Sequence, residues 1–359
     1  MMSADQRFEF SLSGNGQIVV IHFSSRNRKV GSFDRYPVPD CVGNIYVNPG
    51  SPNWYLDGVG FDFGVDETIS ILNEACKGYG AEKIYCIGSS MGAWGAAYIG
   101  EQLGANATLL FGPELTLNIY SGFSRENNID GDFPSLKCSD TKHNIVAGVL
   151  CPSDVVNAIY FGRKNGNSFF CLNDCGHASA KFLKDKGVLR DVIERFVGGG
   201  NLDLSNFLIS PDLLAKLSRD FGCPVSFSEV ELSRYADLMH SHDMKLSSSM
   251  QVVDHLLGRK LYLVASEWLD RSKIRYSDAE EILYRMCRVN RKMKRFSVAV
   301  DLANQLRKSP AYKKLALFEL AQIEARLNGE CSALSLYKAL CEEHSTDPFY
   351  KVAFGKLAE

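Results

Sequence analysis

Between Lys83 and Ala96 the chain reads KIYCIGSSMGAWGA: a β-rich run, then the small residues of GSSMG at 88–92, then a helix-like stretch. Turn-forming Gly and Ser separate the two patterns, so the segment predicts a strand, a tight turn and a helix in that order. The residues at 88–92 fit G-x-S-x-G, a spacing that presents a serine on a sharp turn whose neighbours two positions away must be small. We therefore expect Ser90 to stand above the end of a strand, at the N-terminus of a helix.

Short β-rich runs alternate with helix-like stretches as far as residue 197, which is typical of a largely parallel sheet covered by helices on both faces. Apolar residues recur at three- and four-residue spacing in several of the stretches between the runs, which predicts helices there. The first part of the chain is therefore predicted to be an α/β domain. The expected strands lie at 18–23, 45–47, 83–87, 108–111, 144–150 and 168–172, and the clearest helices at 67–76, 91–103 and 179–197.

The Gly-rich stretch at 198–200 predicts a boundary between two domains, 1–200 and 201–359. Beyond the boundary the apolar pattern has a helical period, which predicts an all-α domain. The end of this domain repeats itself, because Ala265, Ala299 and Ala333 are 34 residues apart. A small residue at a fixed packing position in such a period resembles tetratricopeptide helix pairs, although the full motif of that family is missing. An ordinary helical bundle is the alternative.

Composition and charge narrow the class of protein. The 359 residues include 40 Lys and Arg against 42 Asp and Glu, a formal charge of -2 that offers no global field to attract nucleic acid or an acidic membrane surface. The first residues lack the pattern of a secretory signal, and no apolar stretch reaches the length of a membrane span. The 11 cysteines lack the paired spacing of a zinc site and lie in apolar runs, as reduced core residues do. We therefore expect a soluble, cytoplasmic protein without a metal site.

Ser90 is the candidate nucleophile of an acyl-transfer reaction. The dipole of the following helix and the main-chain N–H of Met91 would stabilise the oxyanion that forms when the serine attacks a carbonyl group. Ser89 is the alternative nucleophile, but only Ser90 has glycines at both second positions. The strand, the motif and the helix together resemble the α/β-hydrolase superfamily, over most of residues 8–197.

This resemblance implies that nucleophile, acid and histidine follow one another along the chain, the acid after a late strand and the histidine after the last one. His177 fits the general base because it follows the last expected strand, whereas His22 lies within a strand and His143 precedes one. Asp154 is the matching acid, which would accept the other imidazole N–H. Asp174, which is nearer to His177 in sequence, is the alternative.

The loop after the expected strand at 18–23 would supply a second oxyanion donor, for which the N–H of Ser24 is the candidate. Three cations follow this serine almost directly, at Arg26, Arg28 and Lys29. They could hold a phosphate or carboxylate group of the substrate, although most basic triplets in loops are merely solvated.

Two further segments bear on the substrate. Trp54 lies in a loop after a strand, where its ring could stack on a sugar or be buried against the sheet. Residues 113–143 form an insertion between two strands that is long enough for a lid or an acceptor platform. Its Ser, Asn and Asp content favours polar acceptors over lipid.

Short segments, among them HFSS at 22–25 and FGP at 111–113, resemble bacterial α/β-hydrolase enzymes that add or remove acetyl groups on surface polysaccharides. Hydrolysis is the commoner activity among enzymes of this fold, and on that ground alone we expect an esterase that acts on an acylated, carbohydrate-type substrate through an acyl-enzyme, without a cofactor. Two alternatives stay open. The protein could be a polysaccharide O-acetyltransferase with acetyl-CoA as donor, or a non-catalytic scaffold that binds a protein partner or self-associates through its helical repeats.

Overall fold

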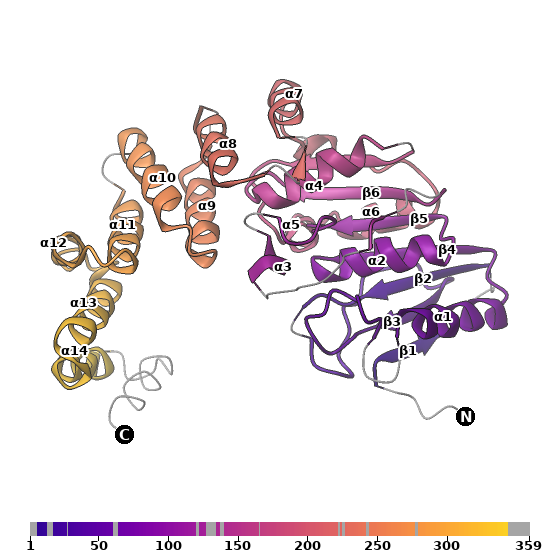
Figure 1. Cartoon of the computed structure of the whole chain (residues 1–359), viewed down its shortest axis with the longest axis horizontal. Coiled ribbons are helices and arrows are strands. Elements are labelled where there is room, and N and C mark those ends of the chain that lie inside the picture. Colours follow the sequence, from indigo (N-terminus) through magenta and orange to yellow (C-terminus); the bar gives the residue numbers. More distant parts are fainter. Residues whose placement is uncertain are drawn as a thin grey trace. The chain divides into compact units, whose positions relative to one another are not determined.

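The computed structural model describes residues 6–12, 17–26, 28–59, 64–119, 122–126, 134–136, 140–164, 166–221, 223–224, 227–241, 244–276 and 279–343. The chain divides into two compact units, Met1–Tyr235 and Ala236–Glu359 (Figure 1). The first unit has α/β architecture, and the described part of the second is helical.

Seven strands form one sheet in the first unit: β1 (Phe8–Ser11), β2 (Ile18–Phe23), β3 (Gly43–Val47), β4 (Lys83–Ser89), β5 (Ala107–Phe111), β6 (Lys142–Gly148) and β7 (Ser168–Leu172). They lie side by side in the order β1-β3-β2-β4-β5-β6-β7. β1 pairs antiparallel with β3, and every other neighbouring pair is parallel. The prediction of an α/β domain with a mostly parallel sheet is therefore confirmed.

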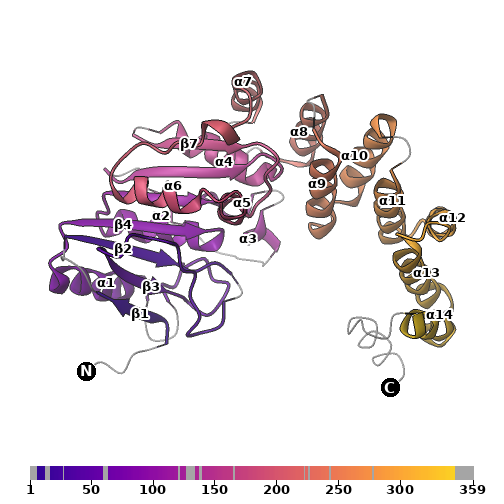
Figure 2. The same cartoon turned by 180° about the vertical axis from the view of Figure 1, so that it is seen from behind.

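Alternate side chains of the central strands enter two different cores, one on each face of the sheet. Val19 and Ile21 lie in the first core and Val20 between them in the second, all three fully buried. This burial on both faces explains why the strands read as continuous apolar runs. The first core includes residues of α1 (Val65–Tyr79), α2 (Met91–Gln102) and α4 (Pro152–Gly162), and the second includes residues of α5 (Ser179–Asp185) and α6 (Leu189–Val197) (Figures 1 and 2).

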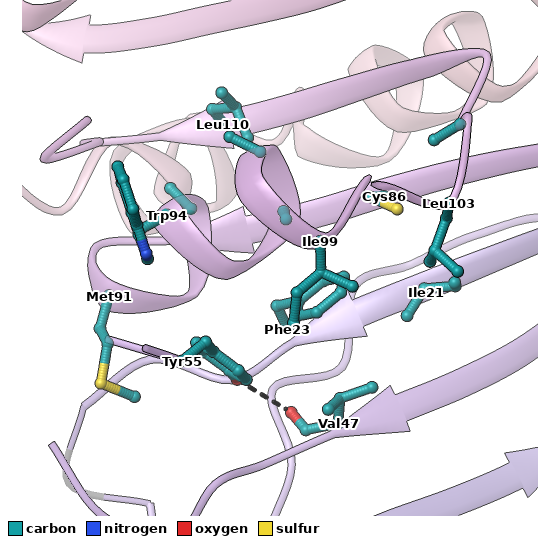
Figure 3. Packing of buried hydrophobic residues seen from close by; sticks show 14 of the residues in the cluster. Ile21, Phe23, Val47, Tyr55, Cys86, Met91, Trp94, Ile99, Leu103 and Leu110 are labelled. Atoms are coloured by element: carbon teal, nitrogen blue, oxygen red, sulfur yellow. Dashed lines mark hydrogen bonds between the residues drawn. The ribbon is translucent and has the colours of Figure 1, made fainter. Parts of the chain in front are cut away.

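Tyr55 anchors the first core where α2 passes over β2 (Figure 3). Its ring meets that of Phe23 edge-on with the ring centroids 5.4 Å apart, and a Cβ at Gly95 of α2 would be 2.5 Å from the Tyr55 Cδ2. The Tyr55 hydroxyl donates to the carbonyl oxygens of Ser24, at 2.9 Å, and Val47, at 3.2 Å. The loop that carries Tyr55 is thereby fixed to the carboxyl ends of β2 and β3.

The first unit extends further than the boundary at 200 that the Gly-rich stretch predicts. Gly199 adopts a φ of 72°, and the chain beyond it returns along the edge strand β7. There the Ile209 N–H donates to the Cys171 carbonyl at 3.0 Å, and Leu204 enters the second core. The glycines therefore make a turn inside the unit. The segment after them covers β7, an edge strand whose main-chain groups would otherwise lack partners. The division lies instead between residues 235 and 236.

The first helices beyond this turn are η1 (Ser205–Phe207) and α7 (Pro211–Asp220), and the division falls within α8 (Glu229–Ser241). The described residues of the second unit then form α9 (Leu246–Gly258), α10 (Tyr262–Arg275), α11 (Glu280–Lys292), α12 (Phe296–Leu306), α13 (Lys313–Asn328) and α14 (Glu330–Glu343).

The second unit is a set of helical repeats. α10, α12 and α14 begin at the same 34-residue spacing as the three repeated alanines. Ala265, Ala299 and Ala333 are each fully buried, so the small side chain serves the same close packing in every repeat. No helix in the described part of the chain is both long enough and apolar enough to cross a membrane.

Candidate active site

Ser90 occupies a strained turn between β4 and α2. Its φ of 56° and ψ of −123° lie outside the regions that L-residues ordinarily adopt. The Ser90 N–H donates to the Phe111 carbonyl at 2.9 Å, and the Ser90 carbonyl accepts from the Ala93 N–H at 2.9 Å. These two main-chain bonds hold the serine in its unfavourable conformation at the N-cap of α2.

The two glycines of the G-x-S-x-G motif are required by backbone contacts. A Cβ at Gly88 would be 2.0 Å from the carbonyl oxygen of Gly92, across the turn. A Cβ at Gly92 would be 2.3 Å from the carbonyl oxygen of Phe23, at the end of β2. Both distances are shorter than any non-bonded contact, so only glycine lets the first turn of α2 pack this closely on β4 and β2.

Three side chains that the sequence predicts as a triad lie within hydrogen-bond distance of one another. His177 Nε2 lies 2.8 Å from Ser90 Oγ. His177 Nδ1 lies 2.9 Å and 3.1 Å from the two carboxylate oxygens of Asp154. In the tautomer that uses both contacts, Nδ1–H donates to Asp154 and Nε2 accepts from the Ser90 hydroxyl. The Asp154 side chain is 1% exposed and that of His177 21%, so the acid is buried while the imidazole reaches solvent.

The acid and the histidine come from adjacent loops at the carboxyl ends of β6 and β7. Asp154 stands in the first turn of α4, and His177 follows β7 in the loop before α5. The Leu150 N–H donates to the Cys175 carbonyl at 2.8 Å, which joins the two loops. A Cβ at Gly148 would be 2.1 Å from the Gly176 carbonyl oxygen, so this glycine lets the loops touch.

Gly112 supports the triad from a third direction, which the sequence did not reveal. It follows β5 with a φ of 52°, and a Cβ there would be 2.2 Å from the His177 carbonyl oxygen. The same Cβ would be 3.2 Å from Asp154 Oδ2. In the sequence, the FGP segment at 111–113 indicates only a resemblance. The position of Gly112, directly after a strand that pairs with the strand of Ser90, is the sequence signal that could have revealed this role.

Ser89 and Asp174, the alternative candidates, do not join this arrangement. Ser89 is the last residue of β4, and its side chain hydrogen-bonds Tyr36. Burial raises the pKa of the Tyr36 phenol, and the hydrogen bond with Ser89 acts in the opposite direction. Both carboxylate contacts of His177 are made by Asp154, whereas Asp174 lies in the turn after β7 with a φ of 52°.

The two predicted oxyanion donors differ in whether their main-chain N–H already has an acceptor. Met91 is the first residue of α2, where a helix N–H has no intrahelical acceptor. The N–H of Ser24 instead donates to the Val47 carbonyl at 2.9 Å, because it continues the pairing of β2 with β3. The Ser25 N–H is also engaged, at 2.7 Å from Asp34 Oδ2. The prediction for Ser24 therefore does not hold in this structure.

Of the basic triplet, Arg26 contacts an aromatic residue that in turn contacts the triad histidine. Its guanidinium carbon lies 5.6 Å from the centre of the Phe123 ring, and that ring lies 4.3 Å from the imidazole of His177. Arg28 forms an ion pair with Asp34. Lys29 is exposed, and no contact joins it to the triad in the described residues.

Trp54, the predicted stacking platform, is 1% exposed and lies in the first core. Of the two roles that the sequence left open for this ring, burial against the sheet is therefore the one observed. A buried ring offers no free face to a sugar.

Phe123 reaches His177 because the insertion folds on buried polar groups. Phe123 is the first residue of α3 (Phe123–Glu126). The next residue, Ser124, donates from its hydroxyl to Glu114 Oε1 at 2.6 Å. The Thr116 N–H donates to Asn157 Oδ1 of α4 at 2.7 Å. Parts of the insertion at 120–121, 127–133 and 137–139 lie outside the described residues. No local signal marks Phe123, since its contact with His177 is tertiary.

Asp154 and His177 could also be ligands of a metal ion together with Cys151, because one donor atom of each lies within 4.8 Å of the other two. Both imidazole nitrogens, however, already have partners in Asp154 and Ser90. An ion would have to replace one of these hydrogen bonds. The observed geometry is thus satisfied by proton donors and acceptors alone.

Comparisons of the chain with known proteins found no match among family models, curated proteins or solved structures. The chemistry of the site is therefore inferred from its geometry.

We predict that Gly112→Ala lowers the reactivity of Ser90 about 100-fold without unfolding the unit. The new methyl group must displace the His177 main chain, and a misplacement of about 1 Å can lower a rate about 100-fold. The measurement is the rate at which a fluorophosphonate probe labels Ser90.

Gly104→Ala is the matched control, because Gly104 also has a positive φ, 63°, but nothing within 4 Å of its added Cβ. It should label within about twofold of the parent chain, as surface substitutions usually leave the fold intact. Equal rates for both variants would show that the contact of Gly112 with His177 does not matter.

Proposed function

We propose that the α/β unit is a serine-dependent acyl-transfer enzyme, and that it hydrolyses an acyl ester of a polar substrate. The observation that carries the proposal is the chain of contacts from Ser90 Oγ through His177 to Asp154, at 2.8 Å and 2.9 Å. The strained backbone of Ser90 adds support, since such strain persists at functional sites where the surrounding structure enforces it.

The proposed reaction has two halves. Ser90 Oγ attacks the ester carbonyl while His177 Nε2 takes the hydroxyl proton, and the same proton then goes to the departing alcohol. The acyl group is left on Ser90. Water then attacks it while His177 takes a proton from the water, and that proton returns to Ser90 Oγ as the acyl–oxygen bond breaks and the carboxylic acid leaves. Asp154 holds the imidazole tautomer and stabilises the imidazolium. The Met91 N–H and the N-terminus of α2 would stabilise the negative oxygen in both halves.

The topology also supports a resemblance to α/β-hydrolases. Ser90, Asp154 and His177 follow β4, β6 and β7 in that order, at the carboxyl edge of the parallel strands. Open α/β sheets bind their ligands at this edge. This likeness concerns the arrangement of the elements only, because one fold can support many activities.

The surroundings of the triad favour a polar or anionic substrate. Arg26 and Phe123 lie on the imidazole side of the site, so a substrate there would meet a cation and an aromatic face. A carbohydrate ester that carries an acidic group fits both features. If a sugar hydroxyl replaces water in the second half, the same acyl-enzyme makes the protein an O-acetyltransferase with acetyl-CoA as donor.

The first test of the proposal is the reactivity of the two adjacent serines. Ser90→Ala should abolish fluorophosphonate labelling and lower the hydrolysis of p-nitrophenyl acetate about 10⁴-fold or more, because the nucleophile is lost. Ser89→Ala is the matched control and should keep both, since its hydroxyl bonds Tyr36 instead of His177. An unlabelled parent chain would reject the proposal and favour a non-catalytic scaffold, and labelling that depends on Ser89 would reject the assignment of Ser90.

A further prediction concerns the charge of the substrate. Arg26→Gln should lower kcat/KM about 10-fold for an ester whose acyl chain ends in a carboxylate, such as mono-p-nitrophenyl glutarate, because a hydrogen bond to a charged group is lost. The neutral p-nitrophenyl acetate should react almost as before. Lys29→Gln removes the same charge from an exposed site and should change neither rate. Equal losses on both esters in Arg26→Gln would mean that Arg26 supports the structure of the loop and does not recognise an anion.

A further inference from the structure

Tyr235 of α8 reaches the turn that carries the catalytic acid. Its side chain is 2% exposed, and its hydroxyl donates to the main-chain carbonyl of Val149 at 2.7 Å. Burial raises the pKa of this phenol well above its usual value, and the neighbouring Cys171, Cys151 and Asp154 raise it further. The hydroxyl therefore remains a neutral donor next to the acid.

Val149 lies in the turn at 148–151, which precedes Asp154, and this turn contacts the loop after β7 that carries His177. Its N–H donates to the Leu172 carbonyl at the end of β7, at 3.0 Å. The next residue, Leu150, donates to the Cys175 carbonyl two positions before His177, at 2.8 Å. The Cys151 N–H closes the turn on Gly148 at 3.0 Å. A shift of the Val149 peptide would therefore move Asp154 and the loop of His177 relative to each other.

The ring of Tyr235 is held in place by aromatic neighbours. Phe221, which follows α7, meets it at a centroid distance of 5.3 Å and an angle of 65°. Phe227, just before α8, packs on Phe221 at 6.4 Å. Phe221 and Phe227 are 3% and 5% exposed. This packing fixes the direction of the hydroxyl, so the hydrogen bond to Val149 is a rigid support.

We propose that Tyr235 is a positioning residue, which keeps Asp154 in register with His177 by holding the Val149 carbonyl. The inference rests on the proposed acyl-transfer function. In the described residues the Tyr235 hydroxyl bonds the main chain and no triad side chain, so it acts through the turn that precedes Asp154. It also lies beyond residue 200, so the segment after the glycine turn completes the catalytic site as well as covering β7.

The test is Tyr235→Phe in the full chain, which removes the hydroxyl and keeps the ring. We expect kcat for p-nitrophenyl acetate to fall about 3- to 10-fold, the effect of one buried hydrogen bond, with KM unchanged. Tyr337→Phe is the matched control, because it removes a buried phenol that bonds Gln322 in the helical unit. It should cost similar stability and leave kcat as it is.

A second readout does not depend on turnover. The proton on His177 Nδ1 gives a downfield NMR resonance while it is shared with Asp154, and this resonance should shift or broaden in Tyr235→Phe but not in Tyr337→Phe. Unchanged kcat and an unchanged resonance in Tyr235→Phe would overturn the inference. If the parent chain has no turnover, the proposed function fails, while the resonance still decides whether Tyr235 positions the pair.

Discussion

The close approach of α2 to the sheet determines the geometry of the site. Gly92 lies against the main chain of Phe23, and Gly88 lies against Gly92, at separations that exclude any side chain. Because of this contact the chain must reverse direction at Ser90. The residue therefore adopts a φ of 56°, a strained conformation that is energetically unfavourable. The serine is consequently lifted to the edge where the loops after β5, β6 and β7 meet.

The other loops adapt to that position by the same means. Gly112 and Gly148 let three main-chain segments come into contact around Asp154 and His177. These main-chain contacts hold the two triad residues in position. Tyr235 adds a hydrogen bond to the Val149 carbonyl, in the turn that precedes Asp154. Sites built on rigid elements hold their geometry better than sites on free loops, and this one uses both.

The sequence predicted the parts that depend on local pattern. Ser90, Asp154 and His177 follow from a motif and from the order of the strands, and the structure brings all three together. The pairing of the Ser24 N–H with Val47 could not be foreseen, because it depends on the register of β2 against β3. The contacts of Phe123 and Tyr235 are tertiary and leave no periodic signal. The Gly-rich stretch at 198–200 predicted a domain boundary, but a flexible sequence is found in turns inside a unit as well as in linkers. Which of the two it forms depends on tertiary contacts.

In the proposed mechanism, Ser90 carries the acyl group during the reaction. The most direct measurement is mass spectrometry of the full chain, quenched in acid while it turns over p-nitrophenyl acetate and then digested into peptides. We expect one acetyl group on Ser90 that disappears once the ester is consumed. An unmodified Ser90 during turnover, or an acetyl group on another residue that forms and decays at the rate of the reaction, would contradict it.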